Sequence, residues 1–339
     1  MPKRKLYEGL PPPPRQPVPF KNVIYFREAV AHATISAFAP HLVIVDHAPA
    51  GLFGEAAAAL TTLDQLRPRP SFVFLMRDIT FGAQQTRDLW RQERAFDFLD
   101  RVYDRILVYG SRDLFDPIQE YELSAAAAAK TRFCGYLRPP APMQTAADIR
   151  HELGVADRRL VVLTVGGGAD GGAIVRTYLE ALHQRPEPDL ISYLVTGPLL
   201  DHAERRAIAD LANQLPNVIV QTFSTDLIDY LHAADLIVTM GGYNAMVEAV
   251  VARKPTIVIP RTPGSEEQVI RGQRFAERNL VLLLPPNELT AQRLGRAIAD
   301  GLQRPPLPAV SLPLSGRDII MEELMSILSR RFPLDRNSG

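Results

Sequence analysis

The sequence has 339 residues, of which 46% are hydrophobic, and this length and composition suit two α/β domains, each with its own buried core. Lys and Arg together number 38, as do Asp and Glu, so the formal charge is zero. That balance argues against a general nucleic-acid binder, which needs a net positive surface. The single cysteine, Cys134, excludes an intramolecular disulfide and a cysteine-based zinc site, and we interpret it as a small core residue.

Metal and membrane signals are weak in this chain. The seven histidines show no paired spacing of the metalloprotease kind, so no metal site is predicted. No apolar run reaches the ~18 residues that span a bilayer. The N-terminal sequence is basic but continues into prolines, whereas a signal peptide continues into an apolar stretch. We therefore expect a cytoplasmic protein.

The first half of the chain alternates between helical and apolar segments. Residues 1–20 are rich in proline and charge and are expected to form an extended or flexible arm. Short apolar runs that alternate with helical patterns predict βα units and a parallel sheet buried on both faces. Strands are predicted at 41–47 (HLVIVDH), Ser71–Met76, Arg105–Tyr109 and Thr131–Gly135, and helices at Val23–Phe38, Gly54–Leu66 and Arg87–Asp104.

The stretch Gly135–Pro142, GYLRPPAP, interrupts this pattern, because paired prolines stop both a helix and a strand ladder. It predicts a linker between two domains. We expect a proline-rich arm at 1–20, a first Rossmann-like domain at 21–138, a linker at 139–147, a second domain at 148–315, and a C-terminal helix and tail at 316–339.

The second half contains a complete series of predicted strands. Six strand candidates, separated by helical segments, suffice for a Rossmann-like sheet, whereas the first half shows about four. A last helix, Asp318–Arg331, carries its apolar residues on one stripe. The six strands are predicted at Leu160–Val165, Leu190–Val195, Val218–Gln221, Leu236–Met240, Thr256–Ile259 and Val281–Leu284.

A glycine-rich turn follows the first strand of the second half. Gly166, Gly168 and Gly171 match the spacing of the dinucleotide fingerprint, and such a turn lets a phosphate approach the positive end of a helix. The fingerprint also requires an acidic residue at the end of the next strand, and that strand ends in Thr196 and Gly197. The turn therefore favours proximity to a phosphate over a dinucleotide site, with a plain tight turn as the alternative.

The segment from residue 223 to 268 is the most informative one. Its strand LIVTM ends in Gly241 and Gly242 before a helix, which makes a second anion cradle. Glu248 follows in that helix, where a carboxylate can accept hydrogen bonds from both hydroxyls of a ribose; a solvated surface carboxylate is the alternative. Ser224 or Thr225 is expected to cap a helix that carries Asp226 and Asp229.

The loop RTPGSEEQ follows the strand TIVIP and opens the next helix. Ser265, Glu266, Glu267 and Gln268 place polar groups at the same edge of the sheet. The amide of Gln268 and the carboxylate of Glu267 suit sugar hydroxyls, and ordinary capping of a helix N-terminus is the alternative.

These motifs together resemble the C-terminal donor-binding domain of inverting glycosyltransferases typified by the N-acetylglucosaminyltransferase of peptidoglycan lipid II synthesis. The resemblance covers residues 160–300 well, and the whole chain is similar to bacterial proteins described as predicted glycosyltransferases. It implies an α/β protein with two Rossmann-like domains of the GT-B type, the N-terminal one incomplete. It also implies a donor site formed by Gly166, Gly167, Gly168, Phe223, Ser224, Leu227, Gly241, Gly242, Asn244, Glu248, Glu267 and Gln268.

By this resemblance, the segment from Phe223 to Leu227 lies beside the nucleobase, Gly241 and Gly242 meet the diphosphate, Glu248 binds the ribose, and the pair Glu267–Gln268 meets the hexose. Two departures stand out. The family has Gln-Gln where this chain has Glu267–Gln268, and its N-terminal glycine-rich loop, which serves the acceptor and catalysis, has no counterpart here. A late start of the sequence, a truncated paralogue, or strands supplied by another chain would each explain the second departure.

Inverting transfer requires a base for the acceptor hydroxyl and positive character near the leaving diphosphate. Helix N-termini supply the latter in the GT-B type, so neither a metal nor a cofactor is expected. Asp46, His47 and Asp78, at predicted strand ends, are the candidate catalytic or acceptor-binding residues, with a structural role as the alternative; Arg77 could steady a phosphate or pair with Asp78.

The predicted activity is transfer of a hexose, with N-acetylglucosamine as the candidate sugar, from a nucleotide-diphosphate donor that we expect to be UDP-linked. The rival hypotheses are a sugar-nucleotide 2-epimerase of the same fold and a degenerate nucleotide-sugar-binding or scaffold protein. The predicted partners are a nucleotide sugar and an unidentified acceptor, lipid-linked or small, and no nucleic acid. Basic residues around Lys3–Lys5 and the helix Asp318–Arg331 could contact a membrane peripherally.

Overall fold

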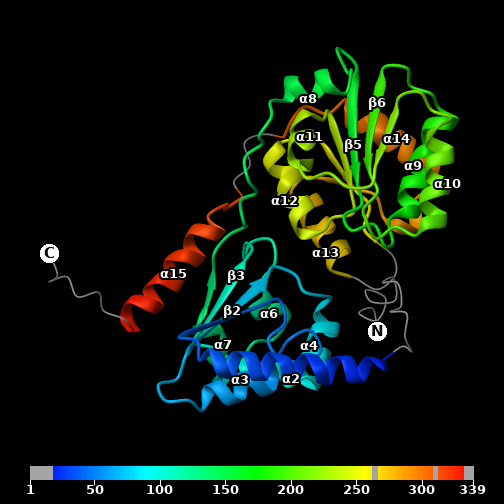
Figure 1. Ribbon diagram of the computed structural model, residues 1–339. Coiled ribbons are helices and arrows are strands. Elements are labelled where there is room, and N and C mark those ends of the chain that lie inside the picture. The colour runs from blue at the N-terminus through cyan, green and yellow to red at the C-terminus, as the bar shows by residue number, and fades with distance from the viewer. Residues whose placement is uncertain (1–17, 262–265, 308–311, 332–339) are drawn as a thin grey trace, which may run out of the picture. The chain divides into compact units, whose positions relative to one another are not determined.

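The computed structural model describes residues 18–261, 266–307 and 312–331 (Figure 1). The predictions for Lys3–Lys5 and Ser265 lie outside these residues. The described chain divides into two compact units. The first unit comprises residues 18–138 and 312–331, and the second unit comprises residues 139–261 and 266–307. The division falls between Arg138 and Pro139, inside the stretch where the sequence places a linker.

The first unit contains a parallel four-stranded sheet in the order β1-β2-β3-β4. All four predicted strands are present within two residues of their expected ends, because a buried parallel strand leaves a continuous apolar run in the sequence. The strands are β1 (Leu42–Asp46), β2 (Ser71–Arg77), β3 (Arg105–Tyr109) and β4 (Thr131–Phe133), and the helices are α2 (Phe20–Phe38), α3 (Ala57–Asp64), α4 (Ala83–Gln92), α5 (Ala95–Arg101), α6 (Pro117–Glu120), α7 (Ala125–Ala129) and α15 (Gly316–Arg331).

The single helix predicted over Arg87–Asp104 is wrong. Two helices, α4 and α5, occupy this region, and Arg94 between them has a left-handed φ of 54°. A left-handed residue ends the helical hydrogen-bond ladder and turns the chain, and for an arginine no sequence signal announces it. The break allows Trp90 of α4 to pack edge-on against Tyr121, with ring centroids 5.3 Å apart.

The C-terminal helix α15 belongs to the first unit. Ile320 and Leu324 on its predicted apolar stripe are buried, whereas Met321 and Met325 beside the stripe are exposed. Glu323 pairs with Arg132 of β4 and lies 3.6 Å from Arg105 of β3. The helix therefore returns to the first sheet after the chain has formed the whole second unit.

The second unit contains a parallel six-stranded sheet in the order β10-β9-β8-β5-β6-β7. This is the doubly wound order of a Rossmann fold, and all six predicted strands are confirmed. The strands are β5 (Arg159–Thr164), β6 (Leu190–Val195), β7 (Val218–Gln221), β8 (Leu236–Thr239), β9 (Thr256–Val258) and β10 (Leu282–Leu283); the helices are α8 (Ala146–Glu152), α9 (Gly172–Gln184), α10 (His202–Ala212), α11 (Leu227–Ala233), α12 (Tyr243–Ala252), α13 (Glu266–Ala276), η2 (Pro286–Glu288) and α14 (Ala291–Leu302).

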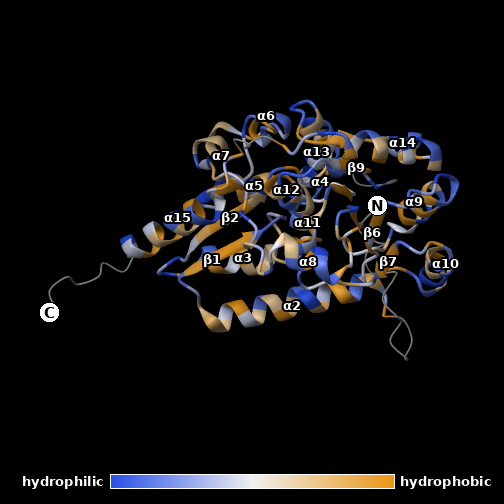
Figure 2. Cartoon of the chain, turned by 90° about the horizontal axis from the view of Figure 1, so that it is seen from above, coloured by the Kyte–Doolittle hydropathy of each residue, from blue (hydrophilic) through white to orange (hydrophobic). Residues whose placement is uncertain are grey.

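Alternate residues of the central strand β5 enter two separate cores of the second unit. Val161 and Leu163 pack with residues of α9, α10 and α14, whereas Leu160 and Val162 pack with residues of α8, α11 and α12. In Figure 2 the strands are mostly orange, and helices such as α10 show both orange and blue. The direction of winding reverses between β5 and β8, so the loops after these two strands flank the crevice where such sheets bind ligands.

Candidate functional site

The turn after β5 has a backbone shape that depends on glycine. Gly166 and Gly168 have φ values of 62° and 87°, and a Cβ atom on Gly168 would lie 2.1 Å from the carbonyl oxygen of Thr196. The turn is thus packed against the loop after β6, and the N–H of Leu199 donates to Gly167 O at 2.8 Å. A Cβ atom on Gly166 would meet no heavy atom within 4 Å. The turn therefore leaves room for a ligand at Gly166 while its other side is fixed.

The turn after β8 repeats this arrangement on the other side of the switch point. Gly241 has a φ of 83°, and a Cβ there would lie 2.8 Å from Val258, whereas a Cβ on Gly242 would meet nothing within 4 Å. Gly242 is the N-cap of α12, and no side chain caps that helix. Asn244, in the first turn, is exposed. The N–H groups and the positive end of α12 consequently lie beside open space, as an anion site requires.

Glu248 lies farther along α12 and is half-buried. Burial raises the pKa of this carboxyl group above its ordinary value. Among the described residues it has no hydrogen-bond or ion-pair partner. A half-buried carboxylate without a partner is costly, and ligand hydroxyls that donate to it would remove part of that cost.

Gln268 has a different contact from the one that the sequence suggested. Its side chain is 4% exposed, and its Oε1 accepts a hydrogen bond from the backbone N–H of Arg261 at 3.0 Å. The amide oxygen thus fastens the loop after β9. Glu267 beside it is half-buried. Contact of this pair with a hexose stays a prediction.

The segment proposed to lie beside a nucleobase begins with Phe223, whose side chain is 63% exposed. Ser224 and Leu227 are half-buried. The expected helix cap at Ser224 or Thr225 is wrong, because α11 starts after Asp226 and no side chain caps it; the hydroxyl of Thr225 donates to Asp226 instead. An exposed aromatic ring at this edge of the sheet is suited to stacking on a base.

Asp229 of α11 was expected to stabilise its helix through the helix dipole, but its hydrogen bonds are to the backbone of the segment before α8. It is buried, and its two carboxylate oxygens accept hydrogen bonds from the backbone N–H groups of Met143 and Gln144, at 2.8 and 3.2 Å. Asp229 therefore anchors the segment that enters the second unit.

The three catalytic candidates of the first unit lie in different surroundings. Asp46 is exposed at the end of β1, and its carboxylate accepts a hydrogen bond from the Tyr109 hydroxyl at 2.7 Å. His47 is half-buried and has a left-handed φ of 70°. Asp78 is 1% exposed and accepts hydrogen bonds from the N–H of Ile79 and from the hydroxyl of Tyr136.

Asp78 thus stabilises the loop after β2 through Ile79 and Tyr136. Asp46 and His47, in contrast, are accessible at the end of the sheet. Tyr109, which sequence reasoning did not select, is buried, and burial raises the pKa of its hydroxyl. A tyrosine at a strand end gives no distinctive sequence signal, because tyrosine is also a common strand residue. Among the described residues, no cluster of His, Cys, Asp and Glu could hold a metal ion.

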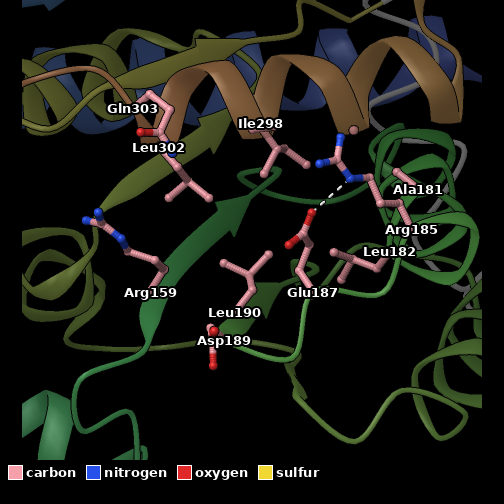
Figure 3. Close-up of a pocket in the computed structure, with 12 residues that line it drawn as sticks. Arg159, Ala181, Leu182, Arg185, Glu187, Asp189, Leu190, Ile298, Leu302 and Gln303 are labelled. Atoms are coloured by element: carbon pink, nitrogen blue, oxygen red, sulfur yellow. Dashed lines mark ion pairs between the residues drawn. The ribbon is translucent and has the colours of Figure 1, made fainter.

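Two cavities in the second unit lie outside the crevice between the glycine turns. One, of about 220 Å³, is lined by residues of α9 and α14 and by the starts of β5 and β6, at the amino edge of the sheet (Figure 3). The Arg185–Glu187 ion pair, at 3.0 Å, lies in its wall. The other, of about 470 Å³, lies at the starts of α9 and α10; its lining holds three carboxylates, of Asp170, Asp201 and Glu204, against the one guanidinium group of Arg176, and this excess of negative charge disfavours an anion.

Comparison with known families matches residues 161–310 to the glycosyltransferase family 28 C-terminal domain. This range includes both glycine turns and Glu248. The second unit is therefore similar to the C-terminal domain of glycosyltransferase family 28. The family 28 domain thus coincides with the sheet of the second unit, and the predicted resemblance is confirmed.

A relative of the family 28 domain is the UDP-N-acetylglucosamine--N-acetylmuramyl-(pentapeptide) pyrophosphoryl-undecaprenol N-acetylglucosamine transferase of Bacillus licheniformis. It is 27% identical over 153 residues, which are 44% of this chain and 41% of the relative. The chain therefore spans about two fifths of the length of the curated relatives it matches.

Solved structures share the fold of both units. The glycotransferase of kitacinnamycin matches with a TM-score of 0.59 and 16% identity, over 92% of this chain and 82% of that one. The UDP-GlcNAc 2-epimerase of Neisseria meningitidis, bound to UDP-GlcNAc, matches with a TM-score of 0.60 and 14% identity, over 92% and 83%. The predicted GT-B-type fold with two Rossmann-like parts is confirmed. No helix in the described part of the chain is long and apolar enough to cross a membrane.

Proposed function

We propose that the chain is a glycosyltransferase that binds a nucleotide-diphosphate sugar, in the UDP form, in the crevice between the turns at Gly166 and Gly242. The family 28 domain supports the transferase class, and the relative from Bacillus licheniformis bears the name of an N-acetylglucosamine transferase. The proposed reaction is transfer of a hexose with inversion, without a metal, because the uncapped start of α12 supplies positive potential where a leaving diphosphate would lie.

The single observation that carries this proposal is Glu248. Its carboxylate is half-buried, has a raised pKa, and has no protein partner among the described residues. It lies on the helix that starts at the open turn of Gly242, so a ligand whose phosphates meet that turn extends toward Glu248. A ribose diol would donate two hydrogen bonds to it. We assign to this carboxylate the ribose of the donor.

Calorimetric titration of the full chain with UDP-GlcNAc, GDP-mannose and dTDP-glucose tests the proposal. We expect UDP-GlcNAc to bind. Binding of none of these donors would refute the donor site. Binding of a GDP or dTDP sugar alone would refute the UDP assignment and retain the site.

The acceptor is proposed from chemistry alone. The name of the Bacillus licheniformis relative specifies a pyrophosphoryl-undecaprenol acceptor. For this chain we propose an acceptor hydroxyl, lipid-linked or on a small molecule, with Asp46 and His47 as the accessible groups that could deprotonate it. A lipid-linked acceptor would require contact of the protein with a membrane surface.

A 2-epimerase is the second candidate, because an enzyme of that activity shares the fold. The two activities differ in their products. Incubation with UDP-GlcNAc followed by chromatography would reveal a 2-epimer if the chain is an epimerase, and it would reveal UDP together with a glycosylated acceptor or free sugar if the chain is a transferase. Binding with neither product would indicate a binding or scaffold protein.

A further inference from the structure

Three loops leave the carboxyl edge of the second-unit sheet next to one another. They follow β9, β8 and β5, which are neighbours in the sheet. An ion pair joins the two outer loops, because the Nε atom of Arg261 lies 3.4 Å from a carboxylate oxygen of Asp170. The pair thus connects the loops on either side of the turn formed by Gly241 and Gly242.

The backbone of Arg261 is held firmly, whereas its side chain is accessible. Ile259 continues the pairing of β9 with β8, since its N–H donates to Thr239 O at 2.8 Å. The N–H of Arg261 then donates to the buried Oε1 of Gln268. Beyond that anchor, the Arg261 side chain is 35% exposed. The backbone of Arg261 is therefore fixed by two hydrogen-bonded neighbours, and about a third of its side chain is open to solvent and to a ligand.

Asp170 is a weak partner for this guanidinium group. Its side chain is 39% exposed, and ion pairs that water reaches contribute little to stability. A diphosphate carries more charge than a carboxylate and offers several oxygens to the planar fork of an arginine. A ligand that brings a diphosphate to Gly166 and Gly242 would therefore compete well for Arg261.

We propose that Arg261 binds the diphosphate of the donor, and that Asp170 pairs with Arg261 only while the site is empty. The inference rests on the proposed function, because it assumes a nucleoside diphosphate between the glycine turns. Arg261 then adds a mobile positive charge to the fixed potential of α12 beside the leaving group. Asp170 competes with the ligand for that charge.

This exchange predicts effects of opposite sign for the two members of one ion pair. Asp170→Asn keeps the shape and removes the competing charge, so UDP should bind roughly two- to fivefold more tightly. Arg261→Met should weaken UDP by about tenfold or more, and uridine by less than about twofold. In the Asp170→Asn/Arg261→Met double variant, the gain from Asp170→Asn should vanish.

Calorimetry with UDP, UMP and uridine on the full chain supplies the measurements. Glu187→Gln is the matched control, because it opens the half-exposed Arg185–Glu187 pair at the amino edge of the same sheet (Figure 3). It should leave all three affinities unchanged. Arg261→Lys retains the charge without the planar fork and should bind UDP with intermediate affinity.

Equal or weaker binding of UDP to Asp170→Asn would overturn the exchange. Unchanged UDP affinity in Arg261→Met, or an equal loss of UDP, UMP and uridine, would overturn the assignment of Arg261 to the diphosphate. If the wild-type chain binds none of the three probes, the proposed function itself fails, and the variants are not needed to show it.

Discussion

Replacement of Glu248 by alanine or glutamine should change donor affinity and fold stability in opposite directions: donor affinity should fall, and stability near neutral pH should rise. The carboxylate is half-buried and has no partner among the described residues, so its charge lowers the stability of the ligand-free fold. Two hydroxyl groups of a ribose would each donate to it, and hydrogen bonds to a charged group contribute about 1.5–3 kcal/mol each. Loss of even one bond of this strength corresponds to about a tenfold change in Kd. We therefore expect Glu248→Ala to weaken UDP binding by more than about tenfold.

Calorimetry with UDP and 2′-deoxy-UDP is the appropriate assay. If Glu248 accepts from the 2′-hydroxyl, the deoxy ligand should bind the wild-type chain weakly and should lose less affinity than UDP in the variant. Glu180→Gln, which changes an exposed glutamate on α9, is the matched control and should behave as wild type. Equal affinity of Glu248→Ala and wild type for UDP would refute the ribose assignment.

The pH dependence of the same site has a definite sign. Because burial raises the pKa of Glu248 in the folded chain, this group favours folding at pH values below its unfolded pKa, and that contribution is lost as the pH rises through the folded pKa. Glu248→Gln should therefore raise the Tm at pH 8, and the difference should shrink toward pH 4. Donor affinity should show the opposite trend and fall with decreasing pH, since the protonated carboxyl group accepts ribose hydroxyls less well. A Tm of Glu248→Gln below wild type at pH 8 would contradict the burial argument.

Three further predictions follow from individual contacts. Gly168→Ala should cost more than ~2 kcal/mol of unfolding free energy in urea titrations, because it combines a left-handed backbone with a clash against Thr196, whereas Gly154→Ala, with a similar φ in open space, should cost only about 1–2 kcal/mol; equal costs would contradict the clash. Arg271→Met should cost about 1–3 kcal/mol, since it removes the donor 3.2 Å from Gly241 O, and should weaken UDP binding as well; a fully stable variant would show that the turn does not need this bond. Burial raises the pKa of the Cys134 thiol to about 12, so iodoacetamide at pH 8 should label the unfolded chain and spare the folded one, and rapid labelling of the folded chain would show the thiol to be accessible.

The strands could be predicted from the sequence nearly to the residue, because each has one dominant requirement. A strand covered on both faces must be apolar throughout, and the turn that follows it toward a ligand must contain residues that tolerate left-handed φ. β6 and β7 match their predicted ranges, and Gly166, Gly168 and Gly241 do have positive φ. These requirements act on neighbouring residues, so they appear in the sequence as apolar runs followed by glycines.

Features that depend on distant parts of the chain could not be predicted. The return of α15 to the first sheet depends on Glu323 meeting Arg132, about 190 positions earlier. The left-handed turn at Arg94 accompanies the packing of Trp90 on Tyr121, which is distant in the sequence. The Arg261–Asp170 pair requires two loops to leave neighbouring positions of a folded sheet. In each case the partners are ordinary charged or aromatic residues, whose type and position in the sequence do not identify the residue that they contact.

The position of Gln268 on helix α13 gives it a protein contact that the sequence did not predict. Residues at this edge of the sheet were assumed to point at the ligand because they are polar. In the fold, Gln268 and Arg271 occupy the buried face of α13, together with Gly272 and Phe275. Among the described residues, Arg271 is the one buried arginine.

The two buried polar side chains of α13 both form hydrogen bonds to backbone groups. Gln268 accepts from the N–H of Arg261, and Arg271 donates to the carbonyl of Gly241. Burying an amide and a guanidinium is costly compared with apolar residues of similar volume, so stability alone does not account for them. What they accomplish is to fix, from one helix, the two backbone segments that border the open space at Gly242. A change at Gln268 should therefore act on the ligand through Arg261, and Gln268→Ala should reproduce a weakened Arg261→Met, with UDP affected more than uridine. If Gln268→Ala instead weakened UDP-GlcNAc and left UDP unchanged, direct contact with the hexose would be the better account of this residue.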